Sequence, residues 1–118
     1  MKLFTKEILS KLKANGLKQA PLKGTKEEID FPPVVKIFTP DANATWLLTE
    51  VEPEEEDIAF GLCDLGMGFP ELGSVRLSEL ESIRGQLGLP IERDLGFHTK
   101  KLLSEYAAEA REAGYIKS

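Results

Sequence analysis

Alternating apolar and small or polar positions predict an antiparallel sheet in the middle of the chain. The pattern is clearest at 58–64, where Ile58, Phe60 and Leu62 alternate with smaller residues, as expected of a strand with two different faces. β-Branched and aromatic residues favour earlier strands at 34–38 and 45–51, and a short fourth strand at 73–76. The connections are short, which favours antiparallel neighbours because a parallel crossover is much longer.

The small residues of the 58–64 strand predict that helices pack closely on one face of the sheet. Ala59, Gly61 and Cys63 share that face, and small side chains leave room for another element. The predicted fold class is therefore α+β: an antiparallel four-stranded meander with three helices packed on it.

Helical spacing and capping residues locate the first two helices. Apolar residues four apart predict a helix over 5–14, with Thr5 as its N-cap and Asn15-Gly16 as a left-handed stop. Ser78 is followed three residues later by Glu81. This is the spacing of a capping box, so Ser78 is expected to begin the second helix.

The third helix is predicted in the C-terminal segment, 99–118. Apolar residues recur there at helical spacing before Gly114, and the stripe consists of Leu102, Leu103, Tyr106, Ala107 and Ala110. Residues 17–31 contain proline, glycine and lysines but few apolar residues, so they are predicted to form a mobile connector. Residues 1–118 are expected to form a single domain.

Composition predicts a cytoplasmic protein without a membrane segment. The chain has 42% hydrophobic and 30% charged residues, which is ordinary for a globular domain. No apolar run approaches the ~20 residues that a membrane span requires, and the polar N-terminus does not resemble a secretory signal. Cys63 is the single cysteine, so no internal disulfide can form.

Charge is distributed unevenly along the chain. Residues 1–40 carry a net charge of +4, residues 41–98 carry −10, and residues 99–118 carry +1. The meander would gather Glu27, Glu28, Asp30 and the acidic bend at 52–57 at one end. The other end would hold Asp41, Asn43 and a glycine-rich loop with the apolar residues Met67 and Phe69. We therefore expect an acidic pole and a partly apolar rim.

The acidic bend is the first candidate site. Its carboxylates, which are the candidate partner-binding residues, are Glu52, Glu54, Glu55, Glu56 and Asp57. Carboxylates can converge on metal ions, but unneutralised repulsion opposes their convergence, so a solvated hairpin is favoured. No acid has a lysine two positions later, which excludes the common restriction-nuclease pattern.

A second charged cluster follows the second helix. Glu92, Arg93 and Asp94 lie between Ile91 and Leu95, two residues expected to be buried. Arg93 could bind a carboxylate such as Asp64 or Glu81 and lock this segment onto the sheet, and this structural role is favoured over a site role.

Other residues give little indication of catalysis. His98 has no cysteine at ligand spacing, so zinc is not expected, and Cys63 or Ser104 as its nucleophile would have no supporting pattern. Gly66-Met67-Gly68 is not followed by Gly-Lys-Ser/Thr, so a phosphate loop is not expected. No catalytic, metal or cofactor-binding residues are predicted, and no cofactor.

Several short sequences resemble an uncharacterised bacterial domain family of unknown function, often encoded on plasmids and other mobile elements. The resemblance covers Phe38 to Phe97, with a weaker match at 3–12. It depends on the turn 38–40, the pair Thr45-Trp46, the triplet 60–62, the helix 77–85 and the segment 88–95. It departs from the family at Val75-Arg76, and the C-terminal helix looks like an extension. The family implies no activity.

Two classes of function remain open. The first is a non-enzymatic protein-interaction module whose acidic pole or aromatic rim docks on a protein partner, with a DNA-mimicking decoy as an acidic variant. The second is a metal-dependent or nucleic-acid-processing accessory enzyme. A contiguous acidic face would favour the decoy, whereas pairing of the acids with Arg76, Arg84 and Arg93 would not. Binding to duplex DNA is not expected, because phosphate contacts supply most of that affinity.

Overall fold

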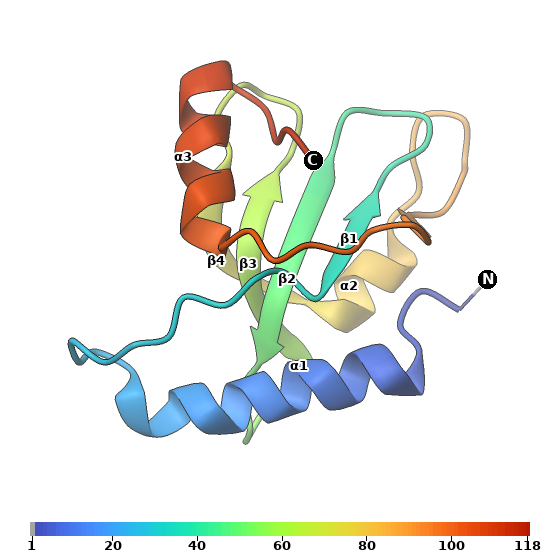
Figure 1. Cartoon of the computed structure of the whole chain (residues 1–118). Helices are drawn as coiled ribbons and strands as arrows, with labels where there is room; N and C mark the ends of the chain where they lie inside the picture. The colour runs from blue at the N-terminus through green and yellow to red at the C-terminus, as the bar shows by residue number, and fades with distance from the viewer. Residues whose placement is uncertain (1) are drawn as a thin grey trace.

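The computed structural model describes residues 2–118 and contains three α-helices, one short 3-10 helix and five strands (Figure 1). Their order is α1 (Lys6–Gln19), η1 (Ala20–Leu22), β1 (Val35–Phe38), β2 (Thr45–Val51), β3 (Ile58–Asp64), β4 (Glu71–Arg76), α2 (Leu77–Ser82), β5 (Glu92–Arg93) and α3 (Leu103–Ala113). The α+β class is confirmed. Within residues 2–118, no helix is both long enough and apolar enough to cross a membrane.

The sheet is antiparallel and contains five strands, one more than predicted. Its order is β4-β3-β2-β1-β5, so the first four strands form the predicted meander. The additional strand, β5, pairs with β1 through Ile37↔Arg93 and Phe38↔Glu92. A two-residue strand is too short to show an alternating pattern in the sequence, which is why it was not predicted.

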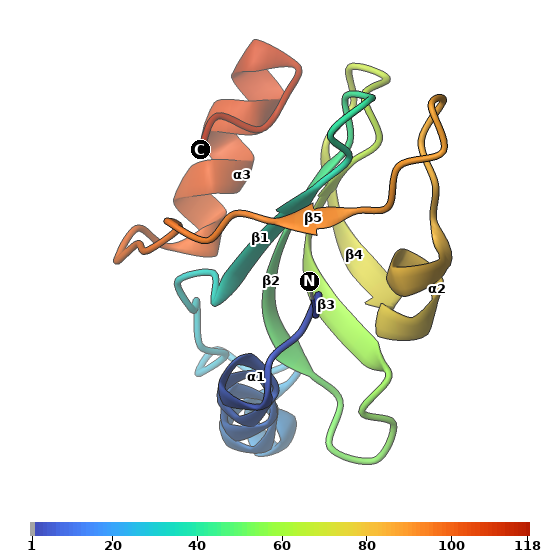
Figure 2. The same ribbon diagram turned by 90° about the vertical axis from the view of Figure 1, so that its right-hand side faces the viewer.

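Helices cover both faces of the sheet rather than the single face predicted. Residues from α1, α2 and the strands form one core, which includes Leu12, Trp46, Leu48 and Leu80. A second core joins Leu47 and Leu62 of the sheet to α3. Figure 2 views the sheet from its β5 side and shows α3 and α2 on opposite sides, with α1 below. The predicted α3 stripe is confirmed for Leu103, Tyr106, Ala107 and Ala110, which are all buried.

Ordinary alternation places Leu47 in one core and Trp46 and Leu48 in the other, and an irregularity in β2 brings Val51 into the Trp46 core as well. The register with β3 shifts between Leu48 and Glu50, which leaves Thr49 as an extra residue, as in a β-bulge. Asn15 of α1 donates its Nδ2 hydrogen to the carbonyl of Thr49 at 2.9 Å. The bulged carbonyl is therefore satisfied by a helix that lies against the strand.

Asn15 and Gly16 do not end α1, and the predicted helix stop is wrong. The helix continues to Gln19, and a Cβ built on Gly16 would lie only 1.9 Å from the carbonyl oxygen of Val51. Gly16 therefore allows close approach of helix and strand, not a left-handed turn. The Thr5 N-cap is confirmed, since its hydroxyl accepts the Ile8 amide at 3.1 Å.

The beginning of the 17–31 segment belongs to α1 and η1. Further along, Gln19 holds Ile29 through two hydrogen bonds: Nε2 donates to the Ile29 carbonyl at 2.7 Å, and Oε1 accepts the Ile29 amide at 2.9 Å. These bonds fasten the returning chain to the end of α1.

Candidate functional site

The acidic bend is a compact turn between β2 and β3. Ile58 donates its amide to the Glu55 carbonyl at 2.9 Å, and Glu52 donates to the Ile58 carbonyl at the same distance. Glu54, Glu55 and Glu56 are exposed. The turn thus presents three neighbouring carboxylates to solvent from a hydrogen-bonded base.

Asp57 has a different role from the rest of the bend, because it caps α2. Its carboxylate accepts the Ser78 amide at 3.0 Å and the Ser78 hydroxyl at 2.7 Å, while its carbonyl accepts the Leu77 amide at 2.8 Å. These bonds to Ser78, with the nearby Arg76, lower the pKa of Asp57. The predicted capping role of Ser78 is therefore wrong. The helix begins at Leu77, and the capping carboxylate is that of Asp57 in the connection between β2 and β3.

The same arrangement recurs at α3. Asp30 accepts hydrogen bonds from the Ser104 amide and hydroxyl. A carboxylate near the first turn of a helix is favourable because unpaired amides are exposed there. Asp30, which was expected to add to an acidic pole, thus joins the chain before β1 to the C-terminal helix.

Basic residues neutralise part of the acidic bend. Arg76 lies 3.9 Å from Glu55 and 3.6 Å from Asp57, and Lys13 lies 3.4 Å from Glu56. The five bend carboxylates thus have two cationic neighbours, which leaves a local excess of negative charge. By contrast, Arg84 donates to the carbonyls of Glu81 and Ile83. Pairing of the bend acids with an arginine is thus present at Arg76, which contacts Glu55 and Asp57.

Arg93 fixes two distant segments of the chain to each other, but its partners differ from those predicted. Its Nη1 donates to the carbonyl oxygens of Lys2 and Leu3, not to Asp64 or Glu81. Asp94 lies 3.7 Å from Lys36, and Glu92 and Arg93 form β5. Ile91 is buried as expected, whereas Leu95 is 69% exposed. This cluster joins the N-terminus to the sheet edge.

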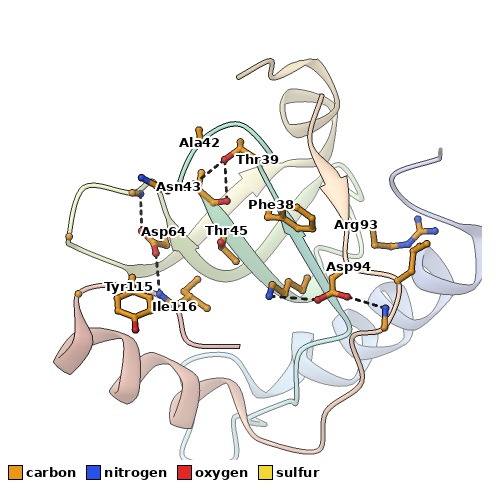
Figure 3. Close-up of a pocket in the computed structure, with 17 residues that line it drawn as sticks. Phe38, Thr39, Ala42, Asn43, Thr45, Asp64, Arg93, Asp94, Tyr115 and Ile116 are labelled. Carbon is orange, nitrogen blue, oxygen red and sulfur yellow. Dashed lines mark hydrogen bonds and ion pairs between the residues drawn. The ribbon is translucent and has the colours of Figure 1, made fainter. Parts of the chain in front are cut away.

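The opposite end of the sheet contains an open pocket of about 900 Å³ (Figure 3). Asp64, only 2% exposed, accepts the Gly66 amide at 2.8 Å and the Ile116 amide at 3.0 Å. These two bonds fix the glycine-rich loop and the C-terminal segment to the end of β3. The buried carboxylate of Asp64 is therefore satisfied by hydrogen bonds that stabilise the fold.

Other ionisable groups do not assemble into a metal site within residues 2–118, where no group of three or more His, Cys, Asp or Glu could hold a metal ion. Burial raises the pKa of the Cys63 thiol, which disfavours the reactive thiolate. Burial also raises the pKa of Glu50, although hydrogen bonding to Gln19 and Thr49 opposes this effect.

Two further surface features lie outside the bend, namely the glycine-rich loop at the other end of β3 and the open edge of β4. The glycine-rich loop exposes Leu65, Met67 and Phe69 by 62%, 75% and 80%, so the rim is apolar at the predicted residues. The open edge of β4 was not anticipated as a binding surface. The sequence indicated this edge only indirectly, because the last strand of a meander, predicted at 73–76, lies at the edge of its sheet.

Comparison with family models matches residues 3–117 to a family described as a protein of unknown function, DUF2958. This match extends beyond the 38–97 resemblance and includes both α1 and α3, so α3 is not an extension outside the family. Comparison with the curated proteins gives no match. Comparison with the solved structures gives none either.

Proposed function

This chain belongs to the DUF2958 family of unknown function, and we propose that it is a non-enzymatic interaction module that binds a basic protein through its acidic bend. One observation carries the proposal: exposed carboxylates are clustered on a turn whose base is hydrogen-bonded to the rest of the domain. Clustered charge on a fixed support attracts a complementary partner and orients it.

The internal contacts of the bend support a docking role rather than a folding role for its outer residues. Asp57 is engaged in capping α2. Glu54, Glu55 and Glu56 project from the turn, and exposed ion pairs such as those of Glu55 and Glu56 contribute little to stability. These three side chains are therefore available for a partner at small cost to the fold.

We place this activity in the bacterial cytoplasm, in the biology of plasmids and other mobile elements. The setting depends on the family resemblance and on the single cysteine, which suits a reducing compartment. The partner in this proposal is a protein and not duplex DNA, because the acidic bend would repel phosphates. The enzyme alternative gains no observation from the geometry.

The test is a comparative pull-down from the native host with three baits. The first is the wild-type chain, and the second carries Glu54→Gln, Glu55→Gln and Glu56→Gln. The third is a matched control with the same charge change at the exposed acids Glu7, Glu81 and Glu112. The proposal expects a basic protein that wild type and control capture and the bend variant does not. Equal capture by all three baits would reject the bend as the docking site.

A further inference from the structure

Strand β4 is an open edge of the sheet. It pairs with β3 on one side, and within residues 2–118 no strand pairs with its other side. Figure 1 shows it at the side of the sheet away from β1, partly behind α3. Natural edges are commonly protected by proline, lysine or a bulge. The β4 sequence contains neither residue, and its pairing with β3 is continuous from Glu71 to Arg76.

Two hollows lie along the α3 side of this strand. Leu72 pairs with Leu62, a residue of the α3 core, and Ser74 pairs with Phe60. Leu72 and Ser74 therefore face the same side as α3, since paired residues share a face. The hollow beside Leu72 has a volume of about 490 Å³ and is lined by Phe69, Ala107 and Arg111, among others.

The hollow beside Ser74 is smaller and acidic. Its volume is about 100 Å³, and the charged residues that line it are Glu28, Glu50, Glu52 and Lys23. Three carboxylates thus outnumber one ammonium group. The acidic bend follows at the same end of β4, where Arg76 pairs with Ile58. One end of the open edge is therefore negatively charged, and the other presents the apolar side chains of Leu72 and Phe69 beside the opposite charges of Glu71 and Arg111.

We propose that the β4 edge binds an extended peptide segment as an added antiparallel strand, with a lysine or arginine beside Ser74 and an apolar residue two positions later beside Leu72. An antiparallel strand runs opposite to β4, so its residue beside Ser74 precedes the residue beside Leu72. All pairs in the sheet are antiparallel, and this pairing is slightly more stable per residue. Main-chain hydrogen bonds supply affinity, and the two hollows supply specificity.

This assignment rests on the proposed function and deepens it by naming the chemistry of the partner. Residues that precede the basic side chain would extend toward the acidic bend, because the bend lies at the Arg76 end of β4. The strand-binding edge and the bend would then contact successive parts of one basic segment.

A second copy of the chain suits this edge less well. Two-fold symmetry allows two registers that pair most of β4, centred on Gly73 or on Ser74. The first places Leu72 of the other copy beside the acidic hollow, and the second places Ser74 there. Neither supplies a basic side chain to the carboxylates that line this hollow.

The experiment uses fluorescent synthetic peptides and the full chain, with binding measured by anisotropy. One peptide is Thr-Thr-Lys-Thr-Leu-Thr-Thr, and the other has lysine and leucine exchanged. We expect the first to bind about tenfold tighter, a difference that corresponds to about 1.4 kcal/mol. Leu72→Lys should abolish this binding, whereas Leu87→Lys, at a position 80% exposed on another loop, should preserve it. Thermal melting checks that both variants are folded.

N-methylation of single peptide amides tests strand addition directly. In an added strand, every second amide points toward β4 and the amides between them point away from it. Methylation of an amide in the first set should weaken binding about tenfold, whereas methylation in the second set should have little effect. The proposal would be overturned if neither peptide bound, or if both peptides bound with equal affinity. It would also be overturned if methylation had the same effect on both sets of amides. A dimer dissociated by Leu72→Lys would assign the edge to a second copy instead. None of these outcomes would alter capture of a partner through the bend, which the pull-down tests separately.

Discussion

Individual residues show where local sequence signals and tertiary contacts diverge. Asn15-Gly16 has the composition of a helix stop, yet α1 continues through it. Asn15 satisfies the bulged Thr49 carbonyl, and Gly16 lies against the Val51 carbonyl. The sequence could not distinguish these uses, because the bulge that requires them lies in another element.

Gly16→Ala should destabilise the domain by about 1–3 kcal/mol, because a methyl group would overlap the carbonyl of Val51 and force α1 away from β2. Chemical denaturation measures the change. Gly73→Ala is the matched control, since an added Cβ meets no atom within 4 Å there. If both variants have the same stability, the close contact between α1 and β2 is not important for the fold.

Trp46→Ala should cost about 3–5 kcal/mol, the usual range for truncation of a large buried aromatic. Trp46 is 3% exposed and belongs to the core shared with α1 and α2. Thermal melting checks this prediction. A melting temperature close to that of the wild type would mean that Trp46 contributes little to the core.

Glu50→Gln should stabilise the protein at neutral pH. Burial raises the pKa of Glu50 above its ordinary value of 4.5, so the folded state disfavours the ionised form. The ionisation penalty is present above the folded pKa and disappears as the pH falls through that value toward 4.5. Unfolding curves across this range should therefore converge for the two proteins at low pH. A variant less stable than wild type at neutral pH would contradict this account.

At the scale of elements, periodicity identified most of the fold. The alternation in β3, the meander and the apolar stripe of α3 could all be recognised in the sequence, because each depends on a local pattern of residues. The extra strand β5 and the caps of α2 and α3 were missed. These features depend on contacts between distant segments, such as Asp57 with Ser78 and Asp30 with Ser104.

The bend and the 92–94 cluster should respond differently to substitution. Arg93→Ala should lose about 1–3 kcal/mol of stability, because Arg93 donates charged hydrogen bonds to the carbonyls of Lys2 and Leu3. The triple glutamine variant at 54–56 should melt close to the wild type, because these side chains are exposed. Melting curves of both variants provide the measurement. The opposite ranking would mean that the roles of the two clusters are reversed.

At the scale of the whole molecule, charge is separated along the sequence, but the fold brings the two kinds of segment into contact at Lys13 and Glu56. The lysine-rich first 40 residues carry a net positive charge, while the central segment that contains the bend is strongly negative. The sequence shows this imbalance and the run of acids in the bend. It could not predict that Arg76 and Lys13 would neutralise part of the cluster, because those pairs form only after the chain has folded.

The most direct test of the acidic bend measures affinity for the captured basic protein as a function of salt concentration. Calorimetric titration should show that wild type binds more tightly at low ionic strength, with a steep loss as salt increases, because exposed charges are screened. The triple glutamine variant should bind more weakly and show a smaller salt dependence. The same affinity and salt dependence in both proteins would contradict the proposal that the acidic bend is the docking site.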